Sequence, residues 1–146
     1  MTGDTSPSES VILHASAVSV KGRGLLIIGP SGSGKSALAL QLMAWGADLV
    51  ADDRTDVFLE AGRLMARCPP TLSGLIEARG VGILRVPSTL PVEIALVADL
   101  GQPEPDRLPP QATVTILGHV CPLVHGKGND HFPASVLCYL KNSRHA

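Results

Sequence analysis

The sequence has few aromatic residues, no excess of charge of either sign and no long apolar run. Only four of its 146 residues are aromatic, so a platform for stacking nucleic-acid bases is excluded and the core has to consist of aliphatic side chains. Twelve Lys and Arg stand against 13 Asp and Glu, a net charge of −1. Binding to a nucleic-acid backbone requires a basic face. We therefore expect no nucleic-acid partner.

The sequence also offers no segment for a membrane. Its most apolar stretch, residues 24–30, is far shorter than the roughly 20 residues of a spanning helix. The first ten residues are polar and acidic, whereas a secretion signal has a basic start and an apolar centre. We expect a disordered tail over residues 1–10 and one domain over residues 11–146.

Cysteine is scarce as well. Cys68, Cys121 and Cys138 are odd in number and widely spaced, which fits neither a disulfide framework nor paired zinc knuckles. We interpret them as three buried thiols of a protein in the reducing cytoplasm.

The apolar patterns predict more strands than helices. Strands are expected over residues 11–20, 25–28, 49–51, 55–59, 64–68, 81–86, 92–98 and 113–117, and helices over residues 36–45 and 134–141. Residues 25–28 are all apolar, which is typical of a strand buried on both faces. Hairpins are mixed with one strand–loop–helix–strand unit. The predicted fold is therefore an α/β domain with a mixed sheet and not an alternating doubly wound one.

A phosphate-binding loop joins the buried strand to the first helix. Its residues fit the pattern G-x-x-x-x-G-K-[ST] at every position and read Gly29, Pro30, Ser31, Gly32, Ser33, Gly34, Lys35 and Ser36. Glycines let backbone N–H groups converge on phosphate oxygens, and the helix N-terminus adds its positive dipole end. Lys35 would reach the β- and γ-phosphates, and the Ser36 hydroxyl would bind Mg²⁺. The sequence thus predicts a nucleotide-phosphate site.

Two adjacent carboxylates follow the next buried strand. Asp52 and Asp53 come 16 and 17 residues after Ser36, so a single helix separates the two strands. An ordinary ATPase needs one carboxylate for Mg²⁺, and the second suits a general base that accepts a hydroxyl proton, as in a kinase. The alternative interpretation is a solvated acidic turn.

With these motifs placed, residues 11–117 resemble the catalytic domain of HPr kinase/phosphorylase, bacterial enzymes that phosphorylate a serine of a small phosphocarrier protein. The supporting motifs are His14, the phosphate loop, Val50 to Arg54, Pro69-Pro70, Ile76-Glu77-Ala78-Arg79-Gly80-Val81-Gly82-Ile83 and Asp106-Arg107-Leu108. The resemblance implies a P-loop domain akin to phosphoenolpyruvate carboxykinase, ATP and Mg²⁺ as cofactors, and an HPr-like phosphocarrier of a phosphotransferase system as partner.

The resemblance also implies a role for each matching residue. Asp53 would take the proton from the substrate serine, and His14 would lie beside that carboxylate. Ser36, Asp52 and Glu77 would surround the metal. Arg107 would stabilise charge on the transferring phosphoryl group, although a solvated arginine is an equally good interpretation of it. Arg79 would order the Glu77 loop.

The sequence departs from the family in several places. We expect no N-terminal domain before the core. The segment Pro87–Pro91 is short, and residues 122–129 match the family's late basic segment poorly. We therefore expect a truncated form with kinase rather than phosphorylase activity. Family members often form hexamers, which suggests a homo-oligomer, but the sequence leaves the oligomeric state open, as it does the choice of ATP or pyrophosphate as donor.

Two other functions stay open from the sequence. The domain could be a regulatory module that senses ATP and transfers little phosphate, since its loops are short. A small-molecule kinase is less favoured, because no arginine-rich lid insertion follows the core.

Overall fold

The computed structural model describes residues 9–145. The tail predicted over residues 1–10 lies outside this range except for its last two residues, and Ser10 already pairs with Phe58 in a strand. Neither helix of the described residues is long and apolar enough to cross a bilayer.

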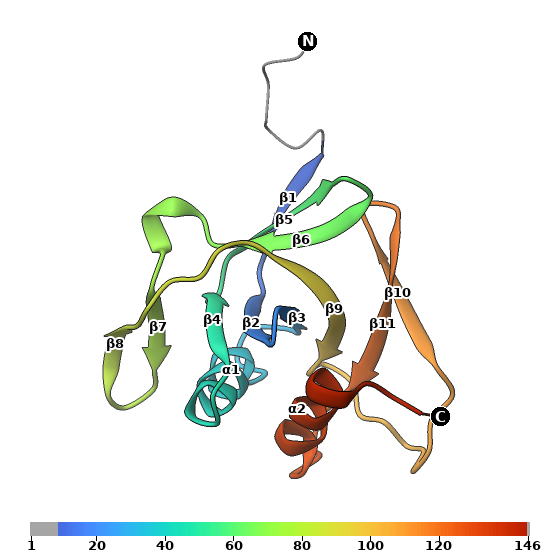
Figure 1. The fold of residues 1–146 in the computed structure, drawn as a ribbon. Coiled ribbons are helices and arrows are strands. Elements are labelled where there is room, and N and C mark those ends of the chain that lie inside the picture. The colour runs from blue at the N-terminus through green and yellow to red at the C-terminus, as the bar shows by residue number, and fades with distance from the viewer. Residues whose placement is uncertain (1–8, 146) are drawn as a thin grey trace.

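Eleven strands, two α-helices and one 3-10 turn form the described fold (Figure 1). In chain order they are β1 (Ser10–Leu13), β2 (Ser16–Val20), β3 (Arg23–Ile28), α1 (Lys35–Ala44), β4 (Asp48–Ala51), β5 (Thr55–Glu60), β6 (Arg63–Arg67), η1 (Pro70–Leu72), β7 (Leu75–Ala78), β8 (Gly82–Arg85), β9 (Val92–Asp99), β10 (Ala112–Ile116), β11 (His119–His125) and α2 (Phe132–Asn142).

The main sheet has nine strands and is mixed, as predicted. Its principal path runs β1-β5-β6-β9-β3-β2-β4, and β10 and β11 extend it from β9. Strand β9 pairs in parallel with β3 and β11, while its first two residues pair antiparallel with β6. Strands β7 and β8 form a separate hairpin. Strand β3 lies between β9 and β2 and is hydrogen-bonded along both edges. The phosphate loop therefore follows directly after a strand in the interior of the sheet.

Hydrophobic packing fixes the central strands on both faces. Leu25 and Ile27 of β3 face the cluster that contains the buried side chains of α1 and α2. Leu26, between them, faces the second cluster, to which β5, β6 and Cys121 of β11 contribute. Successive strand side chains point to opposite faces, so the all-apolar run of β3 fills both clusters. This confirms the prediction of a strand buried on both faces.

Three local predictions were wrong. The strand expected over residues 11–20 is two strands, because the chain bends at His14, where the Ala15 N–H donates to the Leu13 carbonyl at 2.9 Å. Strands β7 and β11 were not predicted at all. Of the three thiols only Cys121 is buried, whereas Cys68 is half-buried and Cys138 is exposed on α2.

Candidate active site

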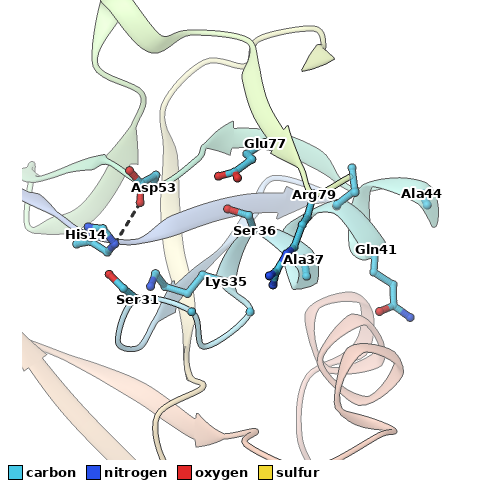
Figure 2. A pocket seen from close by; sticks show the side chains of 13 residues that line it. His14, Ser31, Lys35, Ser36, Ala37, Gln41, Ala44, Asp53, Glu77 and Arg79 are labelled. Carbon is cyan, nitrogen blue, oxygen red and sulfur yellow. Dashed lines mark ion pairs between the residues drawn. The ribbon is translucent and has the colours of Figure 1, made fainter. Parts of the chain in front are cut away.

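Most of the predicted site residues line one cavity. It has a volume of about 680 Å³ and lies between the phosphate loop, α1, the bend before β2, the end of β4 and the β7–β8 hairpin (Figure 2). Its walls include His14, Lys35, Ser36, Asp53 and Glu77. Residues from four separate segments of the sequence thus meet at a single site.

The phosphate loop has the backbone conformation that its glycines permit. Gly34 precedes α1 with a φ of 100°, in the left-handed region where side chains other than glycine are strained. The first turn-closing bond of α1 runs from the Leu38 N–H to the Gly34 carbonyl at 2.9 Å. The N–H groups of Lys35, Ser36 and Ala37 therefore have no intrahelical partner, and they are positioned to bind an anion.

Lys35 folds back over the loop. Its ammonium donates to the carbonyls of Gly29 and Pro30 at 2.8 and 3.0 Å, and the residue is only 6% exposed. Gly29 allows this closure, because a Cβ there would lie 2.6 Å from the Ser33 hydroxyl. The cation is thus held at the loop, where the phosphates of a nucleotide would sit.

Asp52 is held by three hydrogen bonds. Its Oδ1 accepts hydrogen bonds from the hydroxyls of Ser36 at 2.6 Å and Ser16 at 2.9 Å. Its Oδ2 accepts from the Glu77 N–H at 3.1 Å. This carboxylate therefore ties β2, β4, α1 and β7 together.

Asp53 has a different environment. Its Oδ1 lies 3.1 Å from His14 Nε2, and both side chains are 55% exposed. Its backbone is left-handed, with a φ of 68°, which costs a residue other than glycine about 1 kcal/mol. The Asp53 N–H donates to the Ser16 hydroxyl at 3.2 Å and holds this conformation. The carboxylate consequently projects into the cavity, where a second molecule can reach it.

Ser36, Asp52 and Glu77 fit the predicted metal site in chemistry. They supply one hydroxyl and two carboxylates, the oxygen ligands that Mg²⁺ prefers, and Figure 2 shows the Glu77 and Ser36 side chains facing each other. Residues 9–145 contain no group of three or more His, Cys, Asp or Glu arranged around a metal position. A nucleotide-bound Mg²⁺ needs only one or two carboxylates, since phosphates and water complete its shell.

Arg107 is the one predicted site residue that lies elsewhere. It lines a second cavity of about 390 Å³, bounded by the proline-rich loop, β11 and α2. Its expected role at the transferring phosphoryl group remains a prediction. Arg79 lines the active-site cavity, and its expected role in ordering the Glu77 loop also remains a prediction.

Ser16 is a site residue that the sequence did not reveal. It is fully buried and joins Asp52 to Asp53, because its hydroxyl donates to the Asp52 carboxylate and accepts from the Asp53 backbone N–H. A serine within an apolar strand belongs to no sequence motif that would mark it as a site residue. The pairing of β2 with β4, in which Ala17 lies opposite Ala51, places it there.

The neighbourhood of Asp52 also affects a thiol. Burial raises the pKa of Cys68, and the negative charge of Asp52 raises it further. Burial alone raises the pKa of Cys121. Both groups therefore stay protonated, and neither is an activated nucleophile.

The fold and this site together define a phosphate-loop domain of the α/β class. The family model described as HPr Serine kinase C-terminal domain matches residues 6–95, and the chain belongs to that family. Its structure is also similar to that of the Hpr(Ser) kinase/phosphatase from Coxiella burnetii, with a TM-score of 0.78 and 28% identity over 90% of this chain and 89% of that one. The family resemblance and the fold class predicted from the sequence are confirmed.

Relatives named HPr kinase/phosphorylase are similar over parts of their length. One from Azoarcus is 38% identical over 131 residues, which make up 80% of this chain and 42% of the relative. Another from Clostridium tetani is 49% identical over 76 residues, 52% of this chain and 25% of the relative. The chain thus spans less than half the length of these curated relatives.

Proposed function

We propose that this domain transfers the γ-phosphoryl group of ATP, with Mg²⁺, to a serine of an HPr-like phosphocarrier protein. The observation that carries the proposal is the divided environment of Asp52 and Asp53. One carboxylate is held by hydroxyls and an N–H next to the phosphate loop, and the other is open to the cavity beside His14. Two neighbouring carboxylates in different surroundings suit two different roles.

Asp53 would act as the base. It would accept the proton of the substrate serine hydroxyl while the serine oxygen forms a bond to the γ-phosphorus and the bond from that phosphorus to the β–γ bridging oxygen breaks. ADP is the leaving group. His14, 3.1 Å from the carboxylate, would orient Asp53 toward the incoming hydroxyl.

The phosphates would bind over the loop. The N–H groups at the start of α1 and the Lys35 ammonium would compensate their charge. Ser36, Asp52 and Glu77 would hold Mg²⁺, which when bound neutralises charge on the β- and γ-phosphates. Preorganised cations and dipoles of this kind are the main source of catalysis in phosphoryl transfer.

The carrier as acceptor rests on the family. Relatives and the similar structure carry HPr in their names, and the exposure of Asp53 at the cavity mouth leaves room for a serine presented by another protein.

The test is a transfer assay with Mg²⁺, γ-labelled ATP and an HPr-type carrier. We expect label on a carrier serine with the wild-type chain and none with Asp53→Asn, which keeps the size of the side chain but cannot accept the proton. The matched control is Asp56→Asn, since Asp56 is paired with Arg67 outside the site. Nucleotide binding without label on the carrier would contradict the proposal and would indicate an ATP-sensing module.

A further inference from the structure

A buried histidine nitrogen lies near the phosphate loop and has no role in the chemistry proposed above. His125 is the last residue of β11 and pairs in parallel with Asp99, the last residue of β9. Its Nδ1 atom is buried and has no hydrogen-bond partner among residues 9–145. Buried polar atoms are nearly always satisfied, so an unpaired one requires a physical explanation.

The Asp99 carboxylate is the group placed to satisfy this nitrogen. Its Oδ2 lies 3.8 Å from His125 Nδ1, just beyond the range of a hydrogen bond. The side chains of His125 and Asp99 are only 25% and 21% exposed, so solvent screens their interaction less than that of a surface pair. The two backbones are already joined, because the Gly126 N–H donates to the Asp99 carbonyl at 3.0 Å. A small side-chain rotation is therefore enough to close the gap.

The same carboxylate contacts the phosphate loop through Gly101. Its Oδ1 accepts the Gly101 N–H at 2.7 Å. Gly101 in turn packs against the loop, since a Cβ on Gly29 would lie 3.4 Å from the Gly101 nitrogen and a Cβ on Gly101 would lie 3.0 Å from Pro30 Cδ. The two oxygens of a carboxylate can serve two donors at once. A second donor at Oδ2 would therefore fix the orientation of Asp99 and, with it, the position of Gly101 behind the loop.

Protonation makes His125 a stronger donor to Asp99. Histidine side chains gain their positive charge between about pH 8 and 5, and a hydrogen bond between an imidazolium and a carboxylate is shorter and stronger than a neutral one. His125 also lines the second cavity, where the other charged side chains are Glu104, Asp106, Arg107 and Arg144. These four comprise two of each sign, whereas Asp99 alone has ion-pair geometry to His125. The charged imidazole is thus drawn toward Asp99.

We infer that His125 is a positioning residue for the phosphate loop, which acts through Asp99 and holds it most firmly when the imidazole is charged. His125 lines the second cavity and not the active-site cavity, so its effect on the loop is indirect. The charged pair favours the loop conformation that binds phosphates. The part of Mg-ATP affinity that depends on His125 is therefore present at low pH and is lost as pH rises. The inference rests on the proposed function in that the loop binds ATP.

The experiment is calorimetric titration with Mg-ATP at about pH 6 and about pH 8, with the wild-type and His125→Asn chains. Asparagine keeps an amide donor near the position of Nδ1 but cannot become charged. We expect the wild-type chain to bind at least about threefold more tightly than His125→Asn at the lower pH, and the two affinities to agree within about 1.5-fold at the higher pH. Other titrating groups, the ATP phosphates included, are common to both chains. His119→Asn, at the other end of β11, should bind as the wild-type chain does. Equal affinities of the wild-type and His125→Asn chains at both pH values would overturn the inference.

Asp99→Asn tests whether the effect passes through the carboxylate. This variant keeps an acceptor for the Gly101 N–H and removes the charge that attracts His125. Adding His125→Asn to it should leave the Mg-ATP affinity at the lower pH unchanged. If His125→Asn weakens binding equally with and without the Asp99 carboxylate, the proposed route is wrong.

Hydrogen exchange of the Gly101 amide, measured without nucleotide, distinguishes this inference from the proposed function. We expect this amide to exchange at least about threefold faster in His125→Asn than in the wild-type chain at the lower pH. That difference in a protein that leaves the carrier unlabelled would contradict only the proposed function. Labelled carrier, together with equal Gly101 exchange and equal Mg-ATP affinity in the two chains, would overturn only the role of His125.

Discussion

At the scale of single residues, the site separates two carboxylates that are adjacent in the chain. Asp52 is engaged by Ser16, Ser36 and the Glu77 N–H, while Asp53 turns through a left-handed backbone toward His14. Ser16 is central to this arrangement because its one hydroxyl bonds to both residues.

Ser16→Ala therefore should damage both activity and stability. It removes one hydrogen bond to Asp52 and leaves the Asp53 N–H without its acceptor, and an unsatisfied group of this kind costs about 1–3 kcal/mol. We expect a lower melting temperature and a transfer rate that falls by about tenfold or more. Ser19→Ala, a buried serine of the same strand outside this network, is the control. A Ser16→Ala chain as active as Ser19→Ala would show that the bridge is dispensable.

The sequence predicted the residues whose roles are local. The phosphate loop and the acidic pair are contiguous motifs, and each follows an apolar run that predicts a buried strand. Both could therefore be recognised from the sequence. Glu77 was placed by family resemblance alone. Ser16 escaped prediction because its partners lie 36 and 37 residues away, and only sheet pairing brings them together.

At the scale of elements, the end of β9 supports the phosphate loop from behind. The Leu100 N–H donates to the Ile28 carbonyl at 2.9 Å, which joins the chain after β9 to the end of β3. Asp99 then accepts the Gly101 N–H at 2.7 Å, and Gly101 packs against Pro30. A Cβ on Gly101 would lie 3.0 Å from Pro30 Cδ and 3.1 Å from Asp99 Oδ1.

Gly101→Ala is thus expected to shift the loop and weaken nucleotide binding. The contacts require the proline ring or the carboxylate to move by a few tenths of an ångström, and small displacements of positioning groups have large effects on phosphoryl transfer. Titration with Mg-ATP should show a dissociation constant raised by about three- to tenfold. Gln102→Ala, one residue further along, should bind ATP as the wild-type chain does. Identical affinities for the two variants would mean that β9 does not brace the loop.

The failure to predict strand β11 is explained by how this strand pairs with its neighbours. Proline lacks the N–H that a sheet ladder requires, so Pro122 in the sequence argues against a strand. In the fold, the part of β11 that pairs with β9 is Leu123–His125, and Pro122 lies before it, where β11 has β10 as its single neighbour. The tertiary arrangement thus tolerates a residue that local propensity excludes.

At the scale of the whole molecule, two hydrophobic clusters on opposite faces of β3 hold the sheet against the helices and the outer hairpins. The three thiols lie at different depths in this body. Cys138 is exposed on α2, Cys68 is half-buried near Asp52, and Cys121 belongs to the second cluster.

These depths predict an order of alkylation. Iodoacetamide reacts with thiolates, and the raised pKa of Cys68 and of Cys121 reduces their thiolate fraction. At about pH 7 Cys138 should react first and Cys121 last, as read by peptide mass spectrometry. Because the shift of Cys68 is upward, its labelling in a Cys138→Ser chain should rise only as pH passes the ordinary thiol range. Equal rates for Cys68 and Cys138 at neutral pH would contradict the structure around Asp52.

The central claim is that Asp53 moves the proton while the phosphate loop binds the donor, and one measurement addresses both parts. It is the single-turnover rate of transfer from Mg-ATP to an HPr-type carrier, taken for the wild-type and Asp53→Asn chains at ATP concentrations that saturate each. The account predicts that both chains bind ATP with affinities within about threefold and that the rate for Asp53→Asn falls by about 100-fold or more. A saturated Asp53→Asn chain that transfers phosphate at the wild-type rate would contradict the account.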